Sequence, residues 1–218
     1  MSKLTKYVLC VCLGLVLCGT AQANLLTNGG FEDGDCAWLG DSPSIPGWTY
    51  WGTDGWHMND AGYVMDSKGM LVWWDSVGMY QDVFGVVVGQ EYEFSVSAIT
   101  KAADKLRGWD LMVKAEWTAE NWATIGSSEI GRFIGAKSES NPGDGTDTWK
   151  LISGTAVAPE GAAHGKIYFQ LTHDGVGADW GYTGGSVCFD NASVVLVPEP
   201  ATMALLGLGG LFFIRRRK

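Results

Sequence analysis

The sequence predicts an all-β protein whose body is a single β-sandwich of jelly-roll type. Apolar and polar residues alternate in several segments, and a strand with one buried face has this period of two because successive side chains point to opposite faces. Clusters of Gly, Asp and Asn separate these segments at short intervals. No long stretch has helical periodicity. Short strands punctuated by turn residues are typical of a sandwich.

Four segments carry the clearest strand signal. Apolar residues occupy every second position in residues 91–99, 109–117 and 166–171, and residues 186–196 form the closing strand. Further strands are predicted at residues 24–33, 48–52, 70–74, 78–88, 122–134 and 148–158. The jelly roll therefore has about nine strands in one domain, residues 24–196.

The N-terminal segment is predicted to be a secretory signal peptide, residues 1–23, removed by signal peptidase. Lys3 and Lys6 precede an apolar run, and Ala21 and Ala23 supply the small residues of a cleavage site. Cys18 raises the alternative of a lipoprotein, but the residue before it, Leu17, is bulkier than lipoprotein processing prefers.

The C-terminal segment has three parts in sequence. Pro198, Glu199 and Pro200 are followed by an apolar stretch, residues 201–214, and then by a basic tail. The basic tail consists of Arg215, Arg216, Arg217 and Lys218. As a helix the apolar stretch would be about 21 Å long, shorter than a comfortable bilayer span. The basic tail would hold its end on the cytoplasmic side.

This layout, residues 197–218, resembles the PEP-CTERM sorting signal of Gram-negative bacteria that make extracellular polysaccharide. The resemblance implies an exosortase that recognises the Pro198-Glu199-Pro200 motif, transient membrane association through the C-terminal helix, and export across the inner membrane. The destination would be the cell envelope, the cell surface or the extracellular matrix. The alternative is a tail retained as a membrane anchor.

The charge of the body excludes one class of partner. The whole chain has a formal net charge of -9, but residues 24–197 carry nine Lys and Arg against 23 Asp and Glu, which makes the body still more acidic. Nucleic acid is therefore not expected as a ligand, because its phosphates require a basic surface.

The body contains a second set of landmarks in a characteristic order. These are residues 24–32 with Asn-Gly-Gly-Phe-Glu at their end, Pro46-Gly47-Trp48, residues 80–83, residues 89–95, and residues 187–194 with Phe-Asp-Asn. Together they resemble galactose-binding-like carbohydrate-binding modules. The resemblance implies a jelly roll whose opening and closing segments lie close together, although many modules of this shape bind something other than sugar.

The same resemblance implies one structural calcium ion held by Glu32 and Asp190, with backbone carbonyl oxygens completing the shell. The alternative is that these two carboxylates only accept hydrogen bonds from turn amides.

Two cysteines remain in the body, Cys36 and Cys188. Because they lie near Glu32 and Asp190 in sequence, the resemblance places them in one corner, where an exported chain could form a disulfide. The alternative is two free cysteines.

All 11 tryptophans lie in the body. An indole stacks on the apolar face of a sugar, and five tryptophans beside Gly, Asp or Asn are candidates for this role: Trp51, Trp56, Trp74, Trp122 and Trp180. The alternative for each is core packing. Trp73 and Trp74 are adjacent in a predicted strand, so they should point to opposite faces.

No catalytic motif is present, neither a nucleophile elbow, a zinc-binding His-Glu-x-x-His nor a phosphate loop. The sequence therefore predicts a non-enzymatic, surface- or matrix-associated protein that binds extracellular polysaccharide. Two alternatives remain: a purely structural acidic matrix protein, and a small polysaccharide lyase or hydrolase.

Overall fold

The computed structural model describes residues 22–41, 45–60, 62–73, 77–138, 140–173 and 183–198. Within these ranges the chain forms eleven strands, two short 3-10 helices and no α-helix. Residues Asn24–Val195 form one compact unit. A second unit comprises Met1–Ala23 and Leu196–Lys218 and lies almost wholly outside the described ranges. Among the described residues, no helix is long and apolar enough to cross a membrane.

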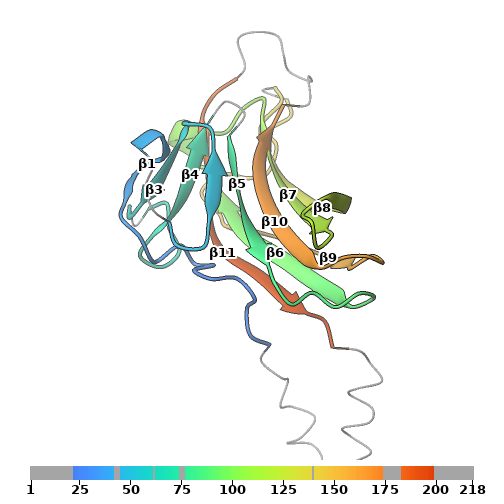
Figure 1. The fold of residues 1–218 in the computed structure, drawn as a ribbon. Helices are drawn as coiled ribbons and strands as arrows, with labels where there is room; N and C mark the ends of the chain where they lie inside the picture. The colour runs from blue at the N-terminus through green and yellow to red at the C-terminus, as the bar shows by residue number, and fades with distance from the viewer. Residues whose placement is uncertain are drawn as a thin grey trace, which may run out of the picture. The chain divides into compact units, whose positions relative to one another are not determined.

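The strands form two sheets, and the strand pairs whose register is described are antiparallel (Figure 1). The six-stranded sheet has the order β1 (Ala37–Trp38), β3 (Gly55–Met58), β4 (Gly69–Trp73), β11 (Ser186–Leu196), β6 (Glu91–Ile99) and β9 (Lys150–Val157). The five-stranded sheet has the order β2 (Thr49–Trp51), β5 (Gly78–Val83), β10 (His164–Thr172), β7 (Asp110–Thr118) and β8 (Thr124–Ile134). The 3-10 helices are η1 (Leu39–Asp41) and η2 (Ala102–Asp104).

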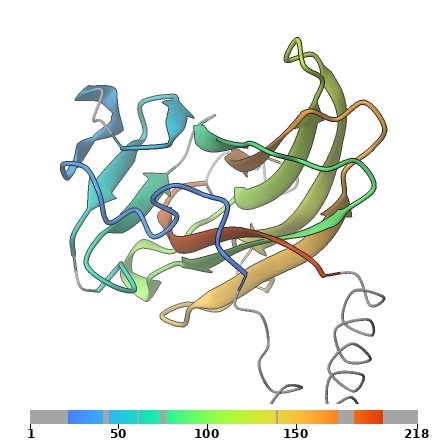
Figure 2. The same ribbon diagram turned by 60° about the horizontal axis from the view of Figure 1, so that its bottom comes forward.

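The hydrophobic core lies between the two sheets, which pack face to face (Figure 2). Alternate residues of β6, β7 and β10 are buried there, among them Phe94, Val113 and Phe169. The first five residues of β11, which include Phe189, are all buried. Phe169 and Phe189, from opposite sheets, have ring centroids 5.0 Å apart. The predicted jelly-roll β-sandwich is confirmed, and the period of two predicted it because β6, β7 and β10 each bury one face.

The long strands match the sequence prediction closely, and so do the short strands β2 and β4, whereas β1 and β3 were not predicted. Residues 91–99 and 186–196 are strands over the predicted bounds, but the segment predicted at 78–88 ends at Val83. The two-residue β1 and four-residue β3 are too short to have a readable period. The strand predicted at 24–33 is wrong, since this segment is a run of turns in which Asn28 and Phe31 have positive φ angles.

The opening and closing segments of the compact unit lie side by side. The Leu25 amide donates to the Val194 carbonyl oxygen at 2.8 Å, and the Ala192 amide donates to Gly29 O at 2.8 Å. The Asn24 side chain bridges the same strand, donating to Ala192 O and accepting from the Val194 amide. Residues 24–32 therefore run along β11, as the resemblance implied, although they do so as turns.

Candidate functional site

The face of the five-stranded sheet that points away from the core carries aromatic and charged side chains. On β10, Ile167, Phe169 and Leu171 are buried in the core, so the residues between them point outward. This outer face, as we call it below, comprises Trp51, Tyr80, Asp82, Met112, Lys114, Glu116, Lys166, Tyr168 and Gln170. These side chains are half-buried.

An aromatic row crosses the outer face. Strand register places Tyr80 of β5 directly opposite Tyr168 of β10, and the two ring centroids are 5.1 Å apart. Trp51 of β2 lies beside both, with its ring centroid 6.3 Å from that of Tyr80 and 6.0 Å from that of Tyr168. Three aromatic rings from three adjacent strands thus form one continuous surface.

Gly78 makes room for the Trp51 ring. Gly78 and Trp51 are cross-strand partners, and a Cβ atom at position 78 would collide with the indole. The indole therefore lies over the backbone of β5. A side chain at position 78 would displace it, so the glycine is part of what positions the aromatic row.

A lysine and an acid flank each tyrosine of the row. The Lys114 ammonium lies 4.4 Å from the Tyr168 ring centroid and 3.0 Å from Glu116 Oε2. The Lys166 ammonium lies 4.8 Å from the Tyr80 ring centroid and 3.6 Å from Asp82 Oδ1. These pairs supply both hydrogen-bond donors and acceptors beside the rings, while the local charge stays balanced.

Tyr168 remains protonated at any physiological pH. Burial raises the pKa of Tyr168 to about 12, and the nearby Glu116 carboxylate adds to the shift. Its hydroxyl donates to Glu116 Oε1 at 3.3 Å. The tyrosine therefore contributes a ring face and a fixed hydroxyl to the outer face, and no proton-transfer role follows from its environment.

A second group of aromatic side chains stands at one end of the outer face. The ring of Trp122, in the β7–β8 turn, is stacked on that of His164 at 4.2 Å with an interplanar angle of 18°. The exposed ring of Phe84 meets both edge-on. The Lys166 ammonium lies 5.6 Å from the Trp122 ring and so links this group to the aromatic row.

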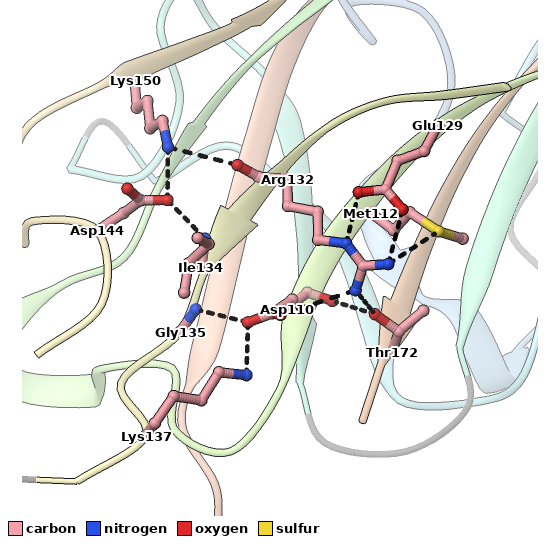
Figure 3. Close-up of polar contacts among 10 residues, drawn as sticks. All are labelled: Asp110, Met112, Glu129, Arg132, Ile134, Gly135, Lys137, Asp144, Lys150 and Thr172. Carbon is pink, nitrogen blue, oxygen red and sulfur yellow. Dashed lines mark hydrogen bonds and ion pairs between the residues drawn. The ribbon is translucent and has the colours of Figure 1, made fainter. Parts of the chain in front are cut away.

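The opposite end of the outer face holds a charged network around the buried Asp110 (Figure 3). Asp110 Oδ1 accepts from the Gly135 amide at 3.1 Å and pairs with the Lys137 ammonium at 2.7 Å. Arg132 lies 3.7 Å from Asp110 Oδ2 and forms a bidentate pair with Glu129. That pair holds the pKa of Glu129 below its ordinary value.

The structure brings together only part of the tryptophan set predicted from the sequence. Trp51 and Trp122 lie on or at the end of the outer face, as described above. Trp56 lies on β3 of the other sheet, where it contacts Trp38. Trp73 points to the same side, since its ring contacts Trp38 at 4.8 Å. Trp74 and Trp180 lie outside the described residues.

Tyr80 and Tyr168 were not predicted as site residues from the sequence. The alternation of Lys166, Tyr168 and Gln170 with buried residues did reveal that Tyr168 points outward. What it did not reveal is that Tyr80, far away in sequence, is its direct cross-strand neighbour, because strand register cannot be read from one strand alone.

Glu32 and Asp190 lie against one loop, residues 65–68. Asp190, fully buried, accepts from the Met65 and Asn191 amides at 2.7 and 2.6 Å. Glu32 accepts from the Ser67 hydroxyl and from the Ser67 and Lys68 amides, both at 3.1 Å. Burial raises the pKa of Glu32, but these hydrogen bonds outweigh it and leave the pKa lowered. Within the described ranges, no three His, Cys, Asp or Glu side chains gather into a metal-binding group.

Asp190 should make stability depend on pH. Burial raises its pKa from 3.8 to about 6, so the folded chain binds the proton more tightly than the unfolded chain. The stabilisation is full below the unfolded pKa and is lost as pH rises through the folded one, about 3 kcal/mol in all. We expect the unfolding free energy of the wild type, relative to Asp190→Asn, to fall by up to this amount between about pH 4 and pH 7 in urea titrations.

The neighbouring exposed acid Asp66 provides the control for this measurement. Asp66→Asn removes an exposed carboxylate from the same loop. The Asp66 charge makes only a small contribution to the raised pKa of Asp190, so the unfolding free energy of this variant should fall with pH almost as far as that of the wild type. If the unfolding free energy of Asp190→Asn varied with pH as that of the wild type does, Asp190 would not be the source of the pH dependence.

The predicted disulfide between Cys36 and Cys188 is wrong, since both cysteines are free. Cys36 directly precedes β1, while Cys188 lies on β11, and β3 and β4 separate these strands. At about 4.8 Å per strand the separation is roughly 14 Å, about twice what a disulfide bridges. The resemblance placed both cysteines near the corner formed by Glu32 and Asp190. The four residues from Glu32 to Cys36 lead the chain away from that corner to the edge strand β1.

The two thiols should react differently with an alkylating reagent. Cys36 is exposed, whereas burial raises the pKa of the Cys188 thiol far above its ordinary value. In the folded protein iodoacetamide should therefore modify Cys36, and Cys188 only after denaturation. Peptide mass spectrometry would show this, and equal labelling of both thiols without denaturant would contradict the packing of β11.

The predicted sorting residues lie at the limit of the described chain. Pro198 is exposed, and Glu199, Pro200, the apolar stretch and the basic tail from Arg215 to Lys218 lie outside the described residues, as does almost all of the predicted signal peptide. The sorting signal is instead supported by a family model, the PEP-CTERM protein-sorting motif, which matches residues 196–218. No curated protein matches the chain.

Several solved structures share the fold. The CBM22-1 xylan-binding domain of Paenibacillus barcinonensis Xyn10C is similar with a TM-score of 0.53 at 17% identity, over 82% of this chain and 97% of that one. TmCBM61, solved with β-1,4-galactotriose, gives 0.51 at 14% identity, over 80% and 99%. The enzymatically active domain of bacteriophage CBA120 tailspike protein 4 gives 0.51 at 15% identity over 80% of this chain, which spans only 21% of the tailspike chain.

At these identities the likeness concerns the fold alone. The sorting motif indicates a secreted, exosortase-processed protein of the cell envelope. The chain therefore carries a PEP-CTERM sorting motif behind a jelly-roll β-sandwich whose fold is similar to that of carbohydrate-binding modules.

Proposed function

We propose that this chain is an exported, non-enzymatic protein that binds extracellular polysaccharide on the outer face of its five-stranded sheet. The observation that carries the proposal is the aromatic row of Trp51, Tyr80 and Tyr168, whose rings form one surface across three strands. Aromatic rings offer a sugar a large apolar surface, and the polar groups beside them can orient its hydroxyls.

The polar side chains of the outer face suit a hydroxyl-rich ligand. Lys114 and Lys166 donate, Glu116 and Asp82 accept, and each sits beside a ring of the row. Because every lysine has an acidic neighbour, the outer face carries no excess charge that would require a charged ligand. The fold likeness to xylan- and galactotriose-binding modules agrees with this function.

The experiment is affinity electrophoresis of the purified chain through gels containing xylan, β-1,4-galactan or the exopolysaccharide of the producing cells. We expect at least one of these to retard the wild type. Trp51→Ala and Tyr168→Ala should each weaken retardation about tenfold or more, the effect of losing a central aromatic contact.

Trp56→Ala is the matched control, because it removes a tryptophan that is 44% exposed on the other sheet. Its retardation should equal that of the wild type. Retardation that is lost in Trp56→Ala but kept in Trp51→Ala would overturn the assignment of the outer face.

The structural alternative is favoured by one observation, the excess of acidic residues in the body. An acidic matrix protein without a sugar site would pass all the gels unretarded, and the Trp51→Ala variant would behave like the wild type. Release of reducing or unsaturated ends from any of the polysaccharides would instead support the enzymatic alternative.

A further inference from the structure

The turn at residues 31–35 is unusual in how its backbone carbonyl groups are satisfied. All five carbonyl oxygens of this turn lie within hydrogen-bonding distance of a side-chain nitrogen. Two of them face His57, two accept from Lys68, and the remaining one accepts from Asn28 Nδ2 at 3.1 Å. Carbonyl oxygens are among the ligands that calcium prefers. The groups that already contact these five oxygens therefore decide whether the turn at residues 31–35 needs a metal ion.

Lys68 fills the centre of this arrangement. Its ammonium donates to Glu32 O at 2.9 Å and to Gly34 O at 2.7 Å. Its backbone amide also donates to the Glu32 carboxylate, and its positive charge helps to lower the pKa of Glu32. One residue thus supplies a cation for two carbonyl oxygens and balances the charge of the adjacent acid.

The His57 ring contacts the first and last carbonyl groups of the turn. It is fully buried, with Nε2 at 2.7 Å from Phe31 O and Nδ1 at 3.1 Å from Asp35 O. Carbonyl oxygens only accept hydrogen bonds, so the ring nitrogen that carries a proton donates to the turn. The turn is therefore held by the side chains of Lys68 and His57 together.

The donor set does not fit the calcium ion that the family resemblance implies. The carboxylates of Glu32 and Asp190 already accept hydrogen bonds from backbone amides and from the Ser67 hydroxyl. The carbonyl oxygens of Glu32 and Gly34 already accept from the Lys68 ammonium. The described residues provide no third acidic ligand beside this pair. A divalent ion bound here would also have to displace the Lys68 ammonium or lie close to it. Repulsion between the two positive charges disfavours that arrangement.

We propose that Lys68 takes the role of a structural cation, so that the turn at residues 31–35 and the loop at residues 65–68 are joined by an internal ammonium group without calcium. The consequence is an exported domain whose stability does not vary with the calcium concentration outside the cell. The proposal does not depend on the proposed glycan site, which lies on the other sheet.

Thermal unfolding of the purified chain in EDTA, in calcium chloride and in magnesium chloride tests this directly. The midpoint of the wild type should be the same in all three. Lys68→Met keeps the length of the side chain but removes the ammonium, and its midpoint should fall by about 5 °C, because two carbonyl oxygens lose their donor.

Two further variants keep the test decisive. Lys68→Arg retains the positive charge and should unfold closer to the wild type than Lys68→Met does. Lys101→Met, the control, removes another half-buried lysine, whose ammonium lies 5.3 Å from the Tyr63 ring centroid, and should shift the midpoint by only about 1 °C or 2 °C. A wild-type midpoint that rises by several degrees in calcium over magnesium overturns the proposal, as does an unchanged midpoint in Lys68→Met.

Discussion

Replacing Asp110 by alanine should lower the free energy of unfolding by about 3 kcal/mol, the cost of removing one partner from a buried charge network. Asp110 is 4% exposed and is the acceptor for the Gly135 amide and the Lys137 ammonium, with the Arg132 guanidinium beside it. The Lys137 side chain is only 8% exposed, so water replaces the lost carboxylate poorly. Urea unfolding followed by tryptophan fluorescence measures the change.

Asp144→Ala is the matched control for this prediction. Asp144 is also paired with a lysine, Lys150, at 2.7 Å, but both side chains are more exposed, 20% and 41%. A more exposed pair contributes less, and the variant should lose about 1 kcal/mol. Equal losses in Asp110→Ala and Asp144→Ala would contradict the view that burial makes the Asp110 network important.

The sequence predicted the sandwich well because three of its long strands, β6, β7 and β10, bury one face each. Residues 91–99 alternate from end to end and became β6 with the predicted bounds. The segment 24–33 failed for a physical reason: its apolar residues lie in turns, and Phe31 reaches the core through a backbone with φ of 56° rather than by strand alternation. The period of two reveals side chains that are buried from a strand, but it does not reveal side chains that are buried from a turn.

The candidate site was predictable only in part. Trp51 and Trp122 could be chosen as exposed tryptophans beside turn residues, but Trp56 has the same local sequence character and lies on the other sheet. Which sheet a strand joins is decided by long-range pairing. The same limit explains the disulfide error, since only the strand order shows that β3 and β4 separate Cys36 from Cys188.

Replacing Trp122 by glycine should weaken polysaccharide binding about tenfold or more while changing the free energy of unfolding by less than about 1 kcal/mol. Trp122 has φ of 65°, a left-handed conformation that suits glycine and costs a bulky residue about 1 kcal/mol or more. The variant relieves this strain, which offsets the lost contacts with His164 and Phe84. The same affinity gels and urea titrations provide both measurements.

A strained and 46% exposed tryptophan is poorly explained by folding alone. If Trp122 served only to close the β7–β8 turn, glycine would be the better residue, and the variant would bind as the wild type does. If the indole instead extends the aromatic row through Lys166, affinity falls although stability does not. Phe84→Ala separates these cases further: it removes a neighbour of Trp122 that is 65% exposed without touching the turn, so it should weaken binding less than Trp122→Gly does. A Trp122→Gly variant that binds normally would confine the glycan site to Trp51, Tyr80 and Tyr168.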